Sequence, residues 1–196
     1  MKPDNESKLV THRINLPNML TWARVIAIPL LVIVYYLPYD MATRNLLATA
    51  IFILAGVTDW LDGFLARKLG QQTTFGEFLD PVADKLLVCS ALVVIVSLGR
   101  VDALIALVII GREITVSALR EWMARIGQSS SVAVQGIGKI KTAFQMTAIP
   151  LLLFDGLIGG IHTRVPGQAL IVVATVLTVW SMLYYLKKAI PHLRKG

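Results

Sequence analysis

The sequence predicts an all-α integral membrane protein with six transmembrane helices and a polar cavity at the cytoplasmic side. Of the 196 residues, 56% are hydrophobic and only 16% are charged, whereas a soluble domain has about 25% charged residues. Apolar segments recur along the chain, and helices are the default for such segments because open strands would leave backbone groups unpaired in lipid. Lys and Arg gather at alternate ends of these segments, which is typical of membrane proteins.

The apolar segments have unequal lengths. They cover residues 19–37, 46–57, 86–98, 103–110, 143–154 and 169–186. Only the first and the last approach the roughly 20 residues that a spanning helix needs. The shorter segments must therefore extend into polar flanks, which are tolerated at membrane depth where they line a shared water-filled cavity.

Turn signals separate the predicted helices. Pro38 lies between the first and second helices, Gly99 between the third and fourth, and a stretch with Gly and Pro over 155–167 between the last two. Near the start, Asn18 is a possible N-cap of the first helix. Residues 1–17 are predicted to form a short interfacial segment, and residues 1–196 a single membrane domain.

The distribution of positive charge predicts the orientation. With six helices and the N-terminus inside, every Lys and Arg except Arg44, Arg100 and Arg164 falls at a cytoplasmic end, where such residues are retained. Both termini are therefore predicted to be cytoplasmic. The net charge of +7 comes from these ends and not from a basic arm with interleaved aromatic residues, so we expect membrane lipids and no nucleic acid as partners.

Aspartates are concentrated between residues 59 and 84, beside long apolar flanks. Asp59 and Asp62 share one face of the second helix, and Asp80 and Asp84 are one turn apart on the third. Asp80 is predicted to cap the third helix, with Pro81 in its first turn, where a missing N–H costs nothing. The loop between the helices is long enough to reverse the chain, so the four carboxylates are expected to converge.

Convergent carboxylates require compensation. Two of them about 4 Å apart repel by roughly 4 kcal/mol at an effective dielectric constant near 20, and Arg67 and Lys85 cannot neutralise all four. Hard divalent cations can do so, and paired cations also clamp a transferring phosphoryl group. Gly63 and Ala66, on the same face as Asp59, leave room for a bulky ligand, although small residues equally serve helix packing. Solvated helix ends without a metal are the remaining alternative.

The spacing of these residues resembles a family signature. Residues 59–67 read D-x-x-D-G-x-x-A-R and residues 76–84 read G-x-x-x-D-x-x-x-D, which is similar to the motif of the CDP-alcohol phosphotransferases. Every defining position matches. The resemblance extends to residues 15–18, 111–113, 117–122 and 138–142, where the chain is most similar to bacterial members that act on glycerol 3-phosphate.

The resemblance implies an activity, a cofactor and a location. It implies transfer of a phosphatidyl group from CDP-diacylglycerol to sn-glycerol 3-phosphate, which yields phosphatidylglycerophosphate and CMP. It also implies a homodimer in the inner membrane of a bacterium. The metal ligands for two divalent cations, Mg²⁺ or Mn²⁺, would be Asp59, Asp62, Asp80 and Asp84, with Asp84 also the general base. The nucleotide pocket would be lined by Gly63, Ala66 and Arg67.

A phosphate-bearing acceptor needs fixed cations near the carboxylates. The candidates on the fourth and fifth helices are Arg112, Arg120, Lys139 and Lys141. The charge bias of membrane proteins alone also predicts cations here. Glu113 lies on the helical face of Arg120 and is a possible partner that would orient its guanidinium. Thr142 and Gln145 are further polar candidates.

Two alternatives stay open. One is a relative that uses another acceptor, namely serine, inositol phosphate or phosphatidylglycerol, of which the predicted cations disfavour serine. The other is a cation transporter, since intramembrane carboxylates also form ion pathways. A transporter would need acids near mid-membrane, whereas these acids cluster at one end. A phosphate-binding loop at 136–139 is rejected, because Ala133 and Ile140 occupy positions where Gly and Ser or Thr are required.

Overall fold

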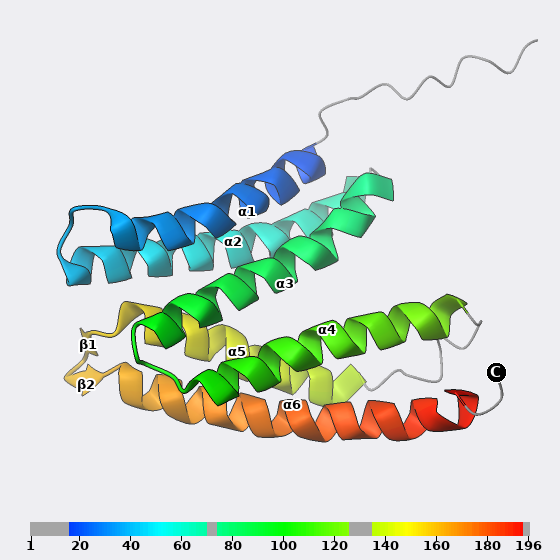
Figure 1. Ribbon diagram of the computed structural model, residues 1–196. Coiled ribbons are helices and arrows are strands. Elements are labelled where there is room, and N and C mark those ends of the chain that lie inside the picture. The colour runs from blue at the N-terminus through cyan, green and yellow to red at the C-terminus, as the bar shows by residue number, and fades with distance from the viewer. Residues whose placement is uncertain (1–15, 70–73, 126–134, 194–196) are drawn as a thin grey trace, which may run out of the picture.

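The computed structural model describes residues 16–69, 74–125 and 135–193, with side chains in these ranges except at 16–20, 59–69, 74–78, 135–137, 139, 185 and 188–193 (Figure 1). These ranges contain six α-helices, one 3₁₀ turn and a small hairpin. The helices are α1 (Leu16–Ile33), α2 (Met41–Leu69), α3 (Thr74–Ser97), α4 (Ala103–Arg125), α5 (Gln135–Phe154) and α6 (Arg164–Leu193). The shorter elements are η1 (Val34–Tyr36), β1 (Leu157–Ile158) and β2 (Ile161–His162). The predicted helix count agrees with the described part of the chain.

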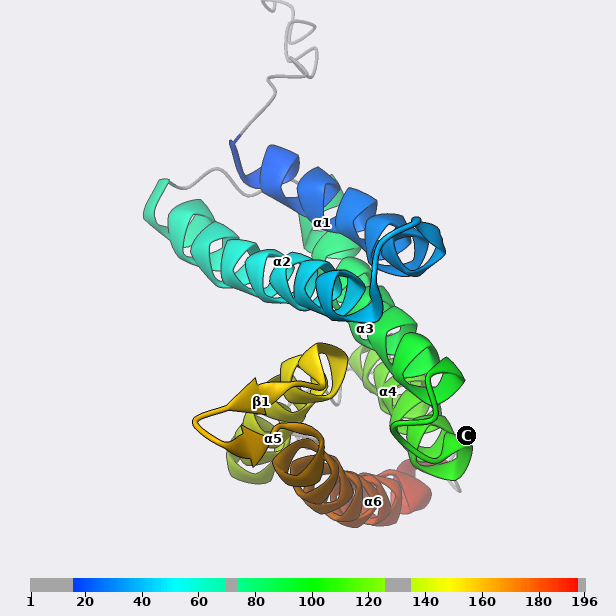
Figure 2. The ribbon, with the colours of Figure 1, turned by 90° about the vertical axis from the view of Figure 1, so that its left-hand side faces the viewer.

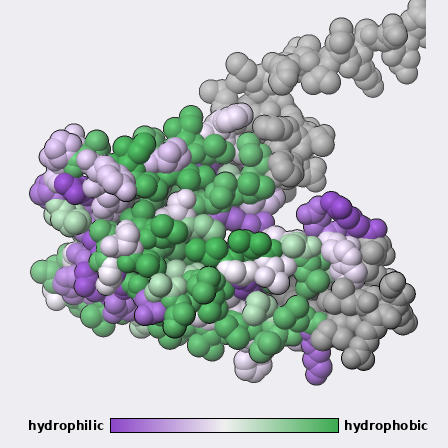
Figure 3. All heavy atoms as spheres, in the orientation of Figure 1, coloured by the Kyte–Doolittle hydropathy of each residue, from purple (hydrophilic) through white to green (hydrophobic). Residues whose placement is uncertain are grey.

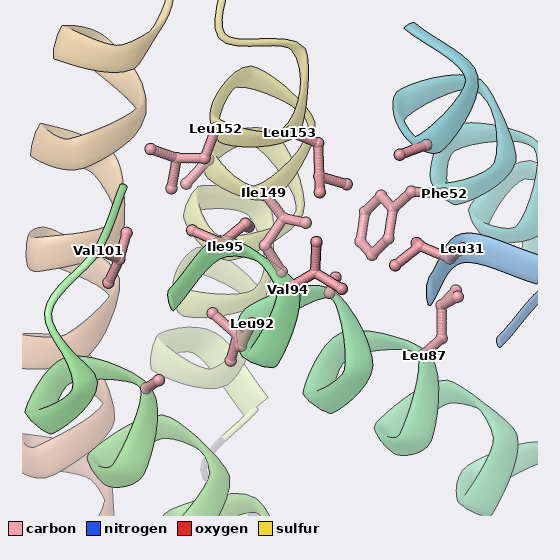
Figure 4. Close-up of a cluster of buried hydrophobic side chains, with 14 of the residues drawn as sticks. Leu31, Phe52, Leu87, Leu92, Val94, Ile95, Val101, Ile149, Leu152 and Leu153 are labelled. Carbon is pink, nitrogen blue, oxygen red and sulfur yellow. The ribbon is translucent and has the colours of Figure 1, made fainter. Parts of the chain in front are cut away.

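The helices form two groups that share a core. α1 packs on α2 and α3, α6 packs on α4 and α5, and α2 contacts α5 across the two groups (Figures 1 and 2). Each helix contributes to the main buried cluster, for example through Leu31, Phe52, Ile95, Ile109, Ile149 and Ile171. Figure 4 shows Phe52 of α2 between Leu31 of α1 and Ile149 of α5. This packing connects the first half of the chain to the second.

The outside of the bundle is largely apolar. Leu104, Leu107 and Trp180 are 70%, 66% and 66% exposed, and Figure 3 shows hydrophobic residues over most of the visible face between more polar ends. Within the described ranges, two helices are long and apolar enough to cross a membrane, over Met41–Thr58 and Arg164–Tyr184. Shorter apolar helices cover Thr21–Tyr36 and Ile140–Phe154. An apolar surface of this extent is typical of contact with lipid.

Two helix beginnings differ from the predicted ones. α3 begins at Thr74, so Asp80 and Pro81 lie inside the helix and the prediction that Asp80 caps it is wrong. α1 begins at Leu16, so Asn18 lies within its first turn and is not the cap. A proline is a weak indicator of a helix start in such a chain. In apolar helix bundles, neighbouring helices can satisfy the backbone group that a proline within a helix leaves without a partner.

The connection between α5 and α6 is shorter than predicted and contains a hairpin. β1 pairs antiparallel with β2, in the register Leu157 with His162 and Ile158 with Ile161. Gly159 and Gly160 turn the chain with positive φ angles of 58° and 82°, as tight hairpin turns require. α6 begins at Arg164. Pro166 and Gly167, which are predicted to belong to the loop, therefore lie in the first turn of α6.

The three cations that depart from the charge bias lie at one end of the bundle. Arg100 donates to Asn45 Oδ1 at 2.8 Å, and its Nε lies 3.1 Å from Asp155 Oδ2. Arg164 donates to both Asp155 oxygens, at 2.8 and 2.6 Å. Arg44 donates to a carbonyl oxygen of η1 at 3.0 Å. These contacts tie the ends of α2, α3, α5 and α6 together, so the exceptional cations have structural partners.

Candidate functional site

Asp80 and Asp84 of α3 lie against α1. Thr21 Oγ1 donates to Asp80 Oδ1 at 2.6 Å, and Arg24 Nη1 donates to Asp84 Oδ1 at 2.8 Å. The same Arg24 nitrogen lies 3.9 Å from Asp80 Oδ1. Because the two aspartates are one helical turn apart, both carboxylates reach the same guanidinium nitrogen. Two of the four carboxylates that are predicted to converge, Asp80 and Asp84, therefore lie together.

Arg24 and Thr21 are site residues that sequence reasoning missed. The Arg24 side chain is 0% exposed, and a buried guanidinium is stable only when it is paired with acceptors. Its charge also offsets the repulsion between the two carboxylates. From the sequence, Arg24 is predicted only to be one of the cytoplasmic cations. The available signal was a cation followed by a long apolar run, which implies a carboxylate partner elsewhere.

The other half of the signature lies on α2. The helix runs unbroken from Met41 to Leu69, so the helical spacing expected between Asp59 and Arg67 holds in the backbone. Only residues 70–73 separate α2 from α3 along the chain. The side chains predicted on this segment, Asp59, Asp62, Gly63, Ala66 and Arg67, lie outside the described ones.

The donor set suits a hard divalent cation. Among the side chains that the structure describes, no group of three or more His, Cys, Asp or Glu residues forms a metal cluster. Asp80 and Asp84 are the described members of the predicted set, and their oxygens converge on one cationic atom. Carboxylate oxygens are the ligands that Mg²⁺ and Mn²⁺ prefer. The carboxylate pair therefore fits the predicted metal.

A cavity of about 310 Å³ adjoins Asp84. It lies between α2, α3, α4 and α5, and small-molecule sites have volumes of about 300–1,000 Å³. Apolar side chains form part of the wall. The polar lining consists of Asp84, Lys85, Glu113, Lys141, Thr142 and Gln145. The structure therefore brings Asp84 and one predicted phosphate-binding residue, Lys141, to a single cavity.

Lys141 in the cavity wall is held by an ion pair. Lys141 is 2% exposed, and its Nζ donates to Glu113 Oε1. Arg112 Nη1 donates to the same oxygen at 3.2 Å, and Arg112 Nη2 donates to Ser181 Oγ at 3.1 Å. The carboxylate of Glu113 thus holds Lys141 and Arg112 together, and the possible pairing with Arg120 is not among its described ion pairs.

The predicted cations therefore have different surroundings. Lys141 lines the cavity. Arg112 is buried and forms an ion pair with Glu113, the same residue that pairs with Lys141. Arg120 is exposed, nearly at the end of α4. The side chain of Lys139 lies outside the described ones. Gln145, named from the sequence as a further polar candidate, lines the same cavity one turn along α5 from Lys141.

Comparison with known proteins gives consistent matches. Residues 14–180 match the family model described as CDP-alcohol phosphatidyltransferase. The chain is 51% identical over 177 residues to the CDP-diacylglycerol--glycerol-3-phosphate 3-phosphatidyltransferase of Salmonella choleraesuis (strain SC-B67), with 89% of this chain and 94% of that protein covered. The protein of the same name from Escherichia coli (strain K12) gives the same identity and coverage. Its counterpart from Sodalis glossinidius (strain morsitans) is 50% identical over 181 residues, 90% of this chain and 96% of that protein.

Proposed function

The chain belongs to the CDP-alcohol phosphatidyltransferase family, and from this premise we propose that it transfers the phosphatidyl group of CDP-diacylglycerol to sn-glycerol 3-phosphate. The products are phosphatidylglycerophosphate and CMP. Relatives with about half of their residues identical are named for this reaction. The structural observation that supports the proposal best is the cavity that contains both Asp84 and Lys141, because the reaction needs a base and a phosphate-binding cation close together.

Four aspartates would hold the metals. The proposed ligands are Asp59, Asp62, Asp80 and Asp84. When bound, two divalent cations, Mg²⁺ or Mn²⁺, offset negative charge on the reacting phosphorus and on the departing CMP. Arg24 fixes Asp84 through its 2.8 Å hydrogen bond, and Thr21 fixes Asp80. These contacts hold the carboxylates in position against α1, and rigid positioning of this kind lowers the barrier to reaction.

Asp84 is also the proposed general base. Its carboxylate lines the cavity, where it would accept the proton of the terminal acceptor hydroxyl. That oxygen then forms a bond to the phosphorus that carries diacylglycerol. The bond from this phosphorus to the CMP oxygen breaks, and its electron pair leaves with CMP.

The two substrates would occupy different parts of the site. The nucleotide pocket is proposed to lie on α2, at Gly63, Ala66 and Arg67, where small residues admit the nucleotide and a guanidinium binds its phosphates. The acceptor phosphate is proposed to bind near Arg112, Arg120, Lys139 and Lys141. Among these, Lys141 has the strongest structural support because it lines the cavity.

The membrane arrangement is proposed from the surface and the charge distribution. We propose that all six helices span the inner membrane of a bacterium, with both termini and the site cytoplasmic, residues 1–17 interfacial, and residues 1–196 one domain. The apolar exterior and the membrane-capable helices support this arrangement. A homodimer remains a proposal that rests on the family resemblance.

A direct assay tests the activity. The purified chain is incubated with CDP-diacylglycerol, Mg²⁺ and one acceptor at a time, and CMP release is measured. We expect release with sn-glycerol 3-phosphate, and only background release with serine, inositol phosphate or phosphatidylglycerol. If glycerol 3-phosphate produces no more CMP than a reaction without acceptor, the proposed function is wrong.

A further inference from the structure

Gln145 on α5 has an unpaired amide oxygen that no step described above uses. The residue is 4% exposed and lines the cavity that contains Asp84. Its Oε1 is buried and has no hydrogen-bond partner among the described residues. Buried polar atoms are nearly always paired, because an unpaired acceptor loses its hydration without compensation. Such an atom in a cavity wall indicates a ligand that donates a hydrogen bond.

Gln145 lines the same cavity as the two residues that are proposed to act on the acceptor, Lys141 and Asp84. It follows Lys141 by four residues on α5, so the two side chains share a helical face. Asp84 lines the same cavity from α3. The cavity therefore has a base, a cation and an unpaired hydrogen-bond acceptor on its walls.

Glycerol 3-phosphate has three polar groups that correspond to these three side chains. Its phosphate requires a cation, and its terminal hydroxyl must lose a proton to a base. Its middle hydroxyl takes no part in bond making and can donate a hydrogen bond. A phosphate dianion has no proton to donate, so the Gln145 oxygen does not suit the phosphate.

We propose that the Gln145 amide oxygen accepts a hydrogen bond from the middle hydroxyl of glycerol 3-phosphate and selects acceptors that carry this hydroxyl. The inference rests on the proposed function and adds a specificity-determining residue to it. A site built to bind a hydroxyl rejects an analogue without that hydroxyl, because its own polar atom then stays unpaired. Gln145 thereby favours glycerol 3-phosphate over an otherwise equal phosphate ester.

The test compares two acceptors and two enzymes. The acceptors are sn-glycerol 3-phosphate and 3-hydroxypropyl phosphate, which lacks only the middle hydroxyl. The enzymes are the full-length wild-type chain and Gln145→Met, a change that nearly preserves side-chain volume. CMP release gives kcat/KM for each acceptor, and KM for CDP-diacylglycerol is measured alongside.

The expected result is a loss of discrimination. Wild type should prefer glycerol 3-phosphate by roughly 100-fold or more. Gln145→Met should reduce this preference to below roughly tenfold, through slower reaction with glycerol 3-phosphate and an equal or faster reaction with the analogue. KM for CDP-diacylglycerol should not change. Met146→Leu, an apolar substitution in the same wall, should discriminate as wild type does.

Other results overturn the inference. If Gln145→Met discriminates as strongly as wild type, or slows both acceptors equally, Gln145 does not bind the middle hydroxyl. Stability provides a second test, because removal of an unpaired buried oxygen should leave Tm unchanged or raise it. A sharp fall in Tm for both Gln145→Met and Gln145→Leu would show that the amide has a structural partner. A wild-type enzyme inactive with glycerol 3-phosphate contradicts the proposed function itself, which is a separate outcome.

Discussion

At the scale of single residues, the site depends on how the Asp84 carboxylate is held. Its Oδ1 accepts a 2.8 Å hydrogen bond from Arg24, whose side chain is fully buried. A base or metal ligand that is held in this way keeps one orientation toward the cavity. Removing the guanidinium would leave two neighbouring carboxylates without this compensating charge.

Arg24→Gln should therefore impair catalysis. A misplaced reacting group can cost roughly 100-fold in rate, so we expect kcat for CMP release to fall by about that factor. Arg24→Lys keeps the charge and serves as the matched variant, with a smaller fall expected. Full activity in Arg24→Gln would contradict a positioning role for this residue.

Substitutions at Asp80 and at Lys141 should change different kinetic parameters. Asp80→Asn should abolish CMP release with every acceptor, because it removes a proposed metal ligand. Lys141→Met should chiefly raise KM for glycerol 3-phosphate, by roughly 10- to 100-fold as expected for a lost charged hydrogen bond, with KM for CDP-diacylglycerol unchanged. Steady-state kinetics with each substrate varied in turn separates the two effects. Identical defects in the two variants would disprove this division of roles.

At the scale of helices and their connections, close packing of α6 on α5 is one determinant of the fold. A Cβ at Gly167 would lie 2.9 Å from Leu152 Cγ and 3.3 Å from Leu151 Cβ. A Cβ at Gly111 of α4 would have no such neighbour within 4 Å. The two glycines therefore differ in whether the fold needs their small size.

Gly167→Ala should destabilise the protein, by about 1–3 kcal/mol as is typical of overpacking. Gly111→Ala, the matched control, should leave Tm unchanged or raise it, because alanine is the better helix former. Thermal unfolding in detergent measures both. Equal Tm values for Gly167→Ala and wild type would show that α6 moves away from α5 at no cost.

The connection after α5 should make stability depend on pH. The Arg164 hydrogen bonds, and the nearby Arg100 charge, hold the pKa of Asp155 below its ordinary value, against the opposing effect of desolvation. His162 also lies 3.7 Å from this carboxylate. A lowered pKa in the folded state stabilises the protein above the unfolded pKa of about 3.9, and this contribution is lost as pH falls through the folded value.

Asp155→Asn should accordingly lower Tm at neutral pH, and the difference from wild type should shrink as pH falls below about 4. Glu121→Gln is the control, because Glu121 and Arg125 form an exposed ion pair and such pairs contribute little. Melting curves across the acid range measure the effect. A difference that persists undiminished to about pH 3 would show that the ionised carboxylate is not the stabilising group.

At the scale of the whole molecule, the helices alternate in direction. The connections after α1, α3 and α5 lie at one end of the bundle (Figure 1), where Arg100 binds both Asn45 and Asp155. The proposed catalytic carboxylates are on the other half of α3. This alternation is the arrangement expected of a chain that crosses a membrane repeatedly.

Thiol labelling tests the proposed orientation. Cys89 is the single cysteine, so a Cys89→Ser background permits one new cysteine at a time. Tyr39→Cys and Leu157→Cys should react with an impermeant maleimide from outside the inner membrane. Ser130→Cys and Lys195→Cys should react only after the membrane is opened. Labelling of Lys195→Cys in sealed cells would contradict a cytoplasmic C-terminus.

The helical class, the number of helices in the described ranges and the family could all be inferred from the amino-acid sequence. Long apolar segments must pair their backbone groups internally, so they predict helices whatever their neighbours are. Helical periodicity likewise placed Asp80 and Asp84 on one face, as found. Helix ends were less predictable, because Pro81 and Asn18 fit a helix start locally but lie inside longer helices.

The contacts between side chains that are distant in the sequence could be identified only in the folded protein. Arg24 and Asp84 are 60 positions apart, and Lys141 and Glu113 are 28 apart, so no local pattern pairs them. The same holds for Gln145, whose unpaired oxygen is recognisable only once the cavity around it is known. Burial and hydrogen-bond pairing depend on packing between helices, and the packing follows from contacts across the whole chain. The carboxylate motif and the candidate residues Lys141 and Gln145 could be recognised in the sequence, whereas the contacts of the carboxylates with Arg24 and Thr21 and the shared cavity could not.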